Sequence, residues 1–436
     1  MRHLPLFLFA FLCLSFSNLA FTNSAVEILN KYQPQTTIKQ QTQEIAFWEQ
    51  KVAQNPTQSL FDYQLAQAYG RLFKLTADIN DLKKAEDLLS HLLDNKGMKD
   101  PSSIQRALAH NYISQHRFKE ALILVADALK NGSGKRASQL MLFDLYAELG
   151  ITEAQEQLLF LLAQQEDFNY FIRLAKWKDS QGNLDGAIEA MKQAEQIAEA
   201  SKQQNQLNWL YTNLGDFYGH AGKIDWSAKY YLKSLAINPA DWYAMKGLAW
   251  IRYSNDDCPE DALSILEKIG TQSQDPGITL LKAEILTYTA NVEKAENIYA
   301  QIKTKVSSTA YGDMYNAFLC DYYLQTQNNA KAMQIAKREI EQRAVPVSYS
   351  LLAQVLYAQN QIEEAQTVSQ EYIWHKSFEP SVLLPQLTFF QNNSSEYICE
   401  IAADLREARF ELGPIQIQEI PEGKCNDWSA LDKKYN

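Results

Sequence analysis

The order of apolar and polar residues between positions 208 and 241 predicts two amphipathic helices joined by a turn. One face of the first helix carries apolar or small residues at i, i+3, i+4 and i+7: Tyr211, Leu214, Gly215 and Tyr218. A polar turn at Gly222 follows, and a second apolar face covers residues 228–235. Pro239 ends the second helix, because a proline disfavours helical geometry in the residue before it. The stretch therefore predicts a helical hairpin.

The same two-helix pattern returns along most of the chain. In each unit the first helix carries a small residue at the place where two crossing helices approach most closely. These places are Ala66, Ala109, Phe143 (a departure in size), Ala175, Gly215, Ala249, Ala283, Cys320 and Ala353. The second helix has a matching alanine at Ala85, Ala121, Ala187, Ala262, Ala295, Ala332 and Ala365. The intervals scatter around the 34 residues that are typical of a two-helix repeat.

The hairpin at 208–241 resembles a tetratricopeptide repeat (TPR), whose signature runs W-x2-L-G-x2-Y, then A-x3-F, then P. Four positions match the signature: Leu214, Gly215, Tyr218 and Pro239. Tyr211, Ser227 and Tyr231 replace its tryptophan, alanine and phenylalanine. The resemblance implies an all-α fold, a right-handed α-solenoid of about nine TPR-like helical hairpins with N- and C-terminal caps.

The chain is expected to divide into four segments. Residues 1–25 form a signal peptide, 26–56 an N-terminal helical cap over the first hairpin, 57–378 the repeat array, and 379–436 a C-terminal capping hairpin and tail. Arg2 followed by an apolar run and then small residues is typical of an export signal, and the run is too short to span a membrane. We therefore expect an exported protein, periplasmic or extracellular, with no transmembrane segment after signal cleavage.

The C-terminal segment shows two further patterns. A helix is predicted from Ser395 to Gly413, and residues 415–418 alternate as in a short strand. Cys399 and Cys425 both lie in this segment, outside the clear repeats. The sequence leaves open whether they pair, and in an oxidising compartment we predict a disulfide between them.

Composition narrows the function classes. A net charge of −11 argues against binding to nucleic acid. The six histidines show no metal-binding spacing, and the sequence has no Gly-rich phosphate loop and no G-x-S-x-G motif. The sequence therefore predicts a protein that is not an enzyme and that uses no cofactor and no metal.

The resemblance also implies where a partner would bind. In TPR arrays the first helix of each hairpin lines a concave groove that holds an extended peptide or a partner helix. Groove residues are expected to be Trp209, Asp216, Tyr243, Lys246, Trp250, Tyr253, Glu284 and Asp321. Aromatic anchors within an acidic rim suit another protein or peptide segment with basic residues beside a hydrophobic anchor.

The hypothesis that follows is a protein–protein interaction scaffold or adaptor of the cell envelope. Three alternatives stay open. One is an enzyme with its site in the last 55 residues, where Glu396, Glu400, Asp404 and Glu411 lie on a predicted helix. The aromatic side chains could only cover the neighbouring hairpin, as part of the core. They could also stack on sugar rings, which would make the chain a small-molecule or oligosaccharide binding protein.

Overall fold

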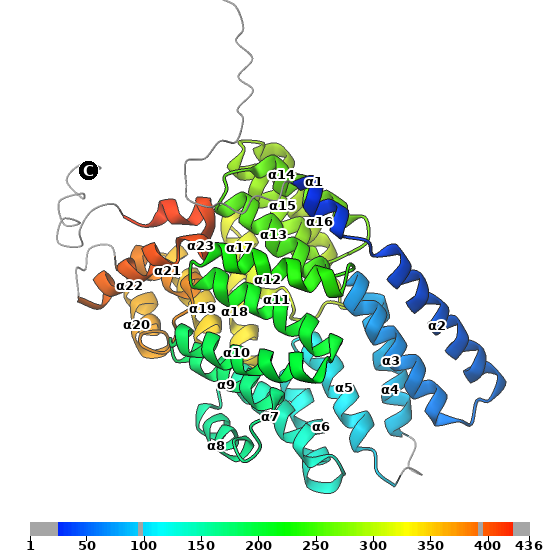
Figure 1. Ribbon diagram of the computed structural model, residues 1–436. Coiled ribbons are helices and arrows are strands. Elements are labelled where there is room, and N and C mark those ends of the chain that lie inside the picture. Colours follow the sequence, from blue (N-terminus) through cyan, green and yellow to red (C-terminus); the bar gives the residue numbers. More distant parts are fainter. Residues whose placement is uncertain (1–24, 95–98, 391–395, 422–436) are drawn as a thin grey trace, which may run out of the picture.

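The computed structural model describes residues 25–94, 99–390 and 396–421, and all regular secondary structure in these ranges is helical (Figure 1). Nine consecutive hairpins form the array, which confirms the predicted solenoid. Their helices are α3 (Ser59–Thr76) with α4 (Ile79–Asp94), α5 (Ser102–Ser114) with α6 (Phe118–Asn131), α7 (Lys135–Leu149) with α8 (Thr152–Leu162), α9 (Phe168–Ser180) with α10 (Leu184–Ser201), α11 (Gln204–His220) with α12 (Ile224–Ile237), α13 (Trp242–Ser254) with α14 (Pro259–Gly270), α15 (Pro276–Tyr288) with α16 (Val292–Val306), α17 (Asn316–Gln325) with α18 (Asn329–Gln342), and α19 (Pro346–Ala358) with α20 (Ile362–Tyr372).

The predicted small-residue places are the contact points of these hairpins. All nine residues at that place in the first helices are buried, and so are the seven alanines in the second helices. Phe143 fits at its larger size because the third hairpin and α9 surround its ring with Leu159, Leu162 and Tyr170. Burial at every repeat explains why the period of the sequence predicts the fold so closely.

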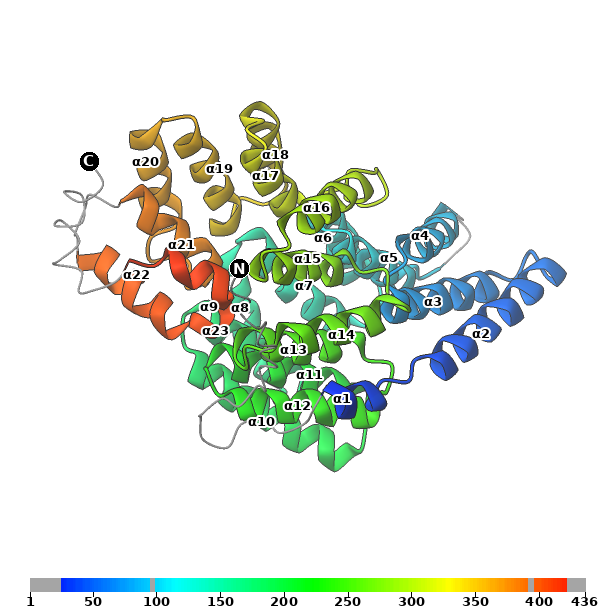
Figure 2. The ribbon, with the colours of Figure 1, turned by 90° about the horizontal axis from the view of Figure 1, so that it is seen from above.

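The array coils until its first hairpin meets its seventh and eighth. Ile79 and Leu82 of the first hairpin share a hydrophobic core with Ile302, Val306 and Leu319. Beside this core, the Gln274 amide donates to the Thr76 carbonyl at 2.6 Å, and the Trp242 indole donates to the Lys74 carbonyl at 3.0 Å. Figure 2 shows the early hairpins, from blue to cyan, returning beside α14 and α16. The first hairpin therefore packs directly against the seventh and eighth, which closes this part of the coil.

The expected N-terminal cap is split between two places. α2 (Gln35–Gln54) packs on α3 of the first hairpin, whereas α1 (Ala25–Lys31) lies against α14 of the sixth. Ile28 and Tyr32 are buried there in the same core as Met245, and the Gln33 amide donates to the Pro239 carbonyl at 2.7 Å. The chain can reach both places because the coil brings the two hairpins near each other.

The C-terminal segment departs from the expectation. α21 (Pro380–Phe389) and α22 (Glu396–Glu407) continue the array, and a short helix, α23 (Arg409–Gln416), then turns back inside the coil (Figure 2). The helix predicted to Gly413 is wrong because the chain breaks at Ala408 and again at Gly413, whose φ is 75°. The predicted strand is also wrong, since a 3-10 turn covers Ile417–Glu419. Within the described residues, no helix is long and apolar enough to cross a membrane.

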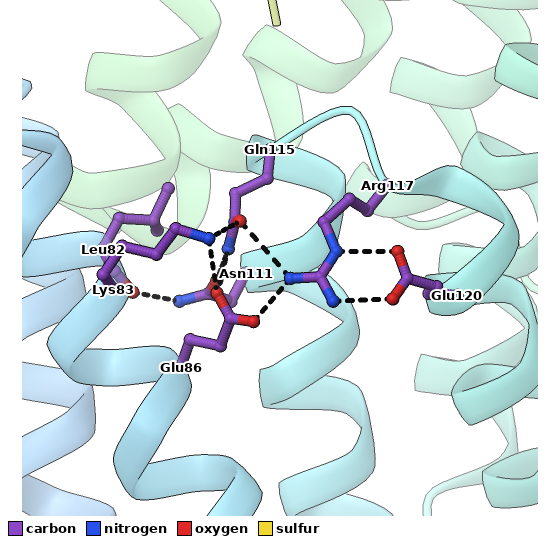
Figure 3. A network of polar contacts seen from close by, with 7 residues as sticks. All are labelled: Leu82, Lys83, Glu86, Asn111, Gln115, Arg117 and Glu120. Carbon is purple, nitrogen blue, oxygen red and sulfur yellow. Dashed lines mark hydrogen bonds and ion pairs between the residues drawn. The ribbon is translucent and has the colours of Figure 1, made fainter. Parts of the chain in front are cut away.

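A polar network joins the first two hairpins (Figure 3). Its members are Leu82, Lys83, Glu86, Asn111, Gln115, Arg117 and Glu120. The Asn111 amide donates to the Leu82 carbonyl at 2.8 Å. The Glu86 carboxylate accepts at 2.5 to 3.1 Å from three side chains at once, one of which is the guanidinium of Arg117. The network fixes the register between α4 and α5 by direct bonding.

Replacing Glu86 by alanine is expected to loosen this junction by about 2 kcal/mol, because three half-buried donors lose one common acceptor. Hydrogen exchange followed by mass spectrometry should show faster exchange in α4 and α5 and unchanged exchange in α19 and α20. Asp87→Ala, an exposed carboxylate one residue further along α4, is the matched control and should leave exchange unchanged. Equal protection in the Glu86 variant and the parent chain would show that the network adds no stability.

Candidate functional site

A cavity of about 510 Å³ opens on the inner face of hairpins five to seven, and α23 forms one of its walls. Five of the eight predicted groove residues line it: Asp216, Tyr243, Lys246, Trp250 and Glu284. The lining also contains residues that were not predicted to lie in the groove, chiefly His220, Tyr231, Tyr299, Phe410 and Glu411. The coil thus brings α11, α13, α15 and α23 around one space.

Tyr231 reaches this cavity from the second helix of the fifth hairpin by passing between two glycines. A Cβ atom at Gly247 would lie 2.4 Å from the Tyr231 ring, and one at Gly215 would lie 2.5 Å from it. The ring therefore needs glycine on both α11 and α13. Its hydroxyl donates to the Asp216 carboxylate at 2.6 Å, which fixes both side chains at the cavity wall.

Trp250 holds α23 against the array. Its indole Nε1 donates to the Phe410 carbonyl at 3.0 Å, and the Ser254 hydroxyl donates to the same oxygen at 2.8 Å. In a regular helix that carbonyl would accept from residue 414, but Pro414 has no N–H to donate. The Phe410 carbonyl is therefore an orphan of its own helix, and the sixth hairpin satisfies it.

Close backbone approach completes the α23 contact. A Cβ at Gly413 would lie 2.7 Å from the Trp250 ring, and one at Gly219 would lie 2.9 Å from the Phe410 ring. The rings of Trp250 and Phe410 meet edge to face at 6.4 Å. Glycines on both partners thus allow α23 to lie directly on α11 and α13.

The cavity holds carboxyl groups in a poorly solvated place. Burial raises the pKa of Glu284 to about 7, an effect that the nearby Tyr253 hydroxyl partly opposes. Burial also raises the pKa of Glu411 to about 7, although the imidazole of His220 lies 4.0 Å away and lowers it. The pKa of Asp216 is raised by burial as well, against the pull of its hydrogen bond from Tyr231. The Lys246 ammonium lies over the Tyr243 ring, 5.0 Å from its centre.

The remaining predicted groove residues are not at the cavity. Tyr253 is 1% exposed and packs in the core of the sixth hairpin, so the expectation that it faces a partner is wrong. Trp209 is exposed and meets the edge of Phe168. Asp321 lies on α17 and is exposed. Trp250 does line the cavity, but its indole N–H is already used by α23, so part of its surface serves the core.

Two other expectations concern metals and cysteines. Within the ranges that the structure describes, no group of three or more His, Cys, Asp or Glu residues is placed to hold a metal ion. Cys258 and Cys320 are both buried, and Cys320 is a free thiol. Cys399 lies on α22, whereas Cys425 lies outside the described residues, so their disulfide remains a prediction.

Comparisons with known proteins were made for the family, for curated relatives and for solved structures. No family model matches the sequence, and no curated protein matches it. The chain is similar to the crystal structure of a tetratricopeptide repeat protein from Parabacteroides merdae ATCC 43184, with 20% identity and a TM-score of 0.38 over 55% of this chain and 93% of that one. It is also similar to the APC/C hetero-tetramer Cut9-Hcn1, with 11% identity and a TM-score of 0.34 over 90% of this chain and 93% of that one.

At TM-scores below 0.5 these likenesses carry no conclusion about function. The fold rests on the chain's own repeats: nine helical hairpins in succession, small residues at the crossing points, and a signature hairpin at 208–241. By this repeat geometry the chain is an α-solenoid of helical hairpins that resemble tetratricopeptide repeats.

Proposed function

We propose that the chain is a non-enzymatic scaffold that holds a segment of another protein on the inner face of hairpins five to seven. The observation that carries the proposal is the docking of α23. The inner face of α11 and α13 already holds a short chain segment through an indole N–H, a hydroxyl and the close approach that Gly219 allows. A surface that satisfies a free backbone carbonyl in this way is built for binding peptide.

The cavity next to α23 favours the interpretation that this face binds a partner and does not only pack against α23. Its open side presents Tyr243, whose side chain is 42% exposed, beside the polar groups of Lys246 and Asp216. An aromatic anchor within a charged rim is the usual composition of a binding hot spot. We also propose that the chain is exported to the cell envelope, because Arg2 is followed by an apolar run that is typical of an export signal.

Tyr243→Ala is expected to reduce capture of the partner from an envelope extract at least tenfold, because it removes the exposed anchor at the cavity mouth. Trp226→Ala is the matched control, since Trp226 is a similarly exposed aromatic residue (47%) on α12 that does not line the cavity. Raising the salt concentration should weaken capture by the parent chain. The helical circular-dichroism signal should stay the same in both variants.

Two results would contradict the scaffold proposal. Capture that survives Tyr243→Ala unchanged would show that the inner face is not used. Loss of capture in Trp226→Ala alone would place the partner on the outer face of the coil.

The second candidate function is binding of a small molecule, and the size of the cavity favours it. About 510 Å³ lies within the range of small-molecule sites, and aromatic rings make up much of the wall. A small ligand would raise the melting temperature of the purified chain in the absence of any protein partner.

A further inference from the structure

The cavity has more negative than positive groups in its wall. α11 contributes Asp216 and His220, α13 contributes Lys246, α15 contributes Glu284 and α23 contributes Glu411. Three carboxyl groups thus face one lysine and one histidine. Because low-dielectric walls surround them, their field in the cavity is stronger than it would be on an open surface.

Lys246, the lysine of the cavity lining, already interacts with groups on one side of the cavity. Lys246 lies over the Tyr243 ring, and its charge acts on Asp216. Asp216 also accepts the Tyr231 hydroxyl at 2.6 Å. The charge of Lys246 therefore offsets that of Asp216 at the wall formed by α11 and α13.

The opposite wall is left acidic. Within the described residues, Glu284 makes no ion pair; burial raises its pKa, and the neutral Tyr253 hydroxyl lowers it in part. Glu411 has His220 at 4.0 Å but also feels the negative charges of Asp179 and Glu379. The Glu284 carboxylate reaches across to α23, where a Cβ at Gly413 would lie 3.6 Å from its Oε1. Glu284 from α15 and Glu411 from α23 thus both line the cavity.

Aromatic rings line the same cavity as these carboxyl groups. Trp250 and Phe410 meet at an interplanar angle of 76°, and Tyr299 lines the cavity from the seventh hairpin. Ring faces attract cations and do so more strongly when water is excluded. The position of the Lys246 ammonium over Tyr243 shows the same chemistry within the chain itself.

We infer that the cavity binds a positively charged group, namely the guanidinium or ammonium group of an arginine or lysine side chain. The cation would lie between Glu284 and Glu411, against the rings of Trp250 and Phe410. That this side chain belongs to a partner protein rests on the proposed function. That the cavity prefers a cation is independent of the proposed function.

The test uses the full-length chain with N-acetyl-arginine amide as the cationic probe. N-acetyl-citrulline amide is its matched neutral probe, because citrulline has nearly the same shape without the charge. Calorimetric titration at pH 8 is expected to show the arginine probe binding at least tenfold more tightly than the citrulline probe. Binding should weaken as the pH falls to 6, where Glu284 and Glu411 take up protons while Asp216, Lys246 and His220 face the same space.

Glu284→Gln should lower the affinity for the arginine probe at least tenfold, since it removes the unpaired carboxylate and keeps the shape. Asp225→Asn is the matched control, because Asp225 is an exposed carboxylate on α12 outside the cavity wall. This control should bind the arginine probe as the parent chain does. Circular dichroism of both variants checks that the coil is intact.

Each outcome separates this inference from the proposed function. Equal affinity for the arginine and citrulline probes, or full affinity in Glu284→Gln, overturns the cation site even if Tyr243-dependent capture of a partner is observed. Preference for the arginine probe without any captured protein leaves the cation site standing and overturns the scaffold. Tetramethylammonium that binds as tightly as the arginine probe would assign the cavity to a free small cation, and the partner side chain would be wrong.

Discussion

Replacing Gly247 by alanine is expected to destabilise the chain by about 2 to 3 kcal/mol, because the added methyl group has no space. It would lie 2.4 Å from the Tyr231 ring. The ring cannot move aside, since Gly215 lies close on its other side, where an added Cβ would be only 2.5 Å from the ring, and its hydroxyl donates to Asp216. Denaturant unfolding followed by circular dichroism should show a lower midpoint for the variant.

The control for this result is Gly270→Ala at the end of α14. A Cβ at Gly270 has no atom within 4 Å, so this substitution should be neutral or slightly stabilising. Tyr231→Leu in the Gly247→Ala background should recover part of the loss by removing the ring. An equal midpoint for the Gly247 and Gly270 variants would show that Tyr231 adapts freely.

The hairpins were predictable because the residues that pack each hairpin lie close together in the sequence of that repeat. The spacing of Tyr211, Leu214 and Tyr218 defines a helix face locally, and the small residue beside it marks the contact point. Such signals need no knowledge of distant residues. Closure of the coil is different, because it depends on contacts such as Gln274 with Thr76, which no local pattern encodes.

The site was predictable only in part for the same reason. Asp216, Tyr243, Lys246, Trp250 and Glu284 lie on successive first helices, so the repeat period alone brings them together. Phe410 and Glu411 come from another part of the chain and carry no such period. One signal was available: a proline directly after a glycine at 413–414 frees a carbonyl upstream and so indicates a segment that needs an outside donor.

The failure of the Tyr253 prediction has a geometric cause. Residues 243, 250 and 253 share roughly one helix face, but position 253 lies at the end of α13, where α15 packs against it. Its ring meets the edge of Tyr288 at 5.4 Å. The same helix face is accessible in the middle of α13 and buried at its end. The sequence pattern does not distinguish the accessible positions from the buried ones.

Raising the pH from 5 to 8 is expected to weaken the docking of α23 at least tenfold. The docked Glu411 has a pKa of about 7, whereas a carboxyl free in solution has its ordinary value of 4.5. Docking therefore takes up a proton between these two values, and it becomes less favourable as the pH rises through them. Above about pH 7 the effect levels off, because Glu411 is then ionised in both states. Hydrogen exchange at residues 409–416, corrected for the intrinsic rate at each pH, measures the docking.

The groups that face Glu411 set the size of this effect. His220 on α11 opposes it, while Asp179 on α9 and Glu379 before α21 add negative charge and act in the same direction. Burial raises the pKa of Asp179 too. Asp179 therefore also gains its negative charge as the pH rises, and this charge repels the Glu411 carboxylate. Glu411→Gln should keep α23 docked and remove most of the pH dependence. Glu407→Gln, which changes an exposed carboxylate on α22, should retain it. If exchange in the parent chain is the same at both pH values, Glu411 does not control the docking of α23, and the wall of the cavity is fixed rather than adjustable.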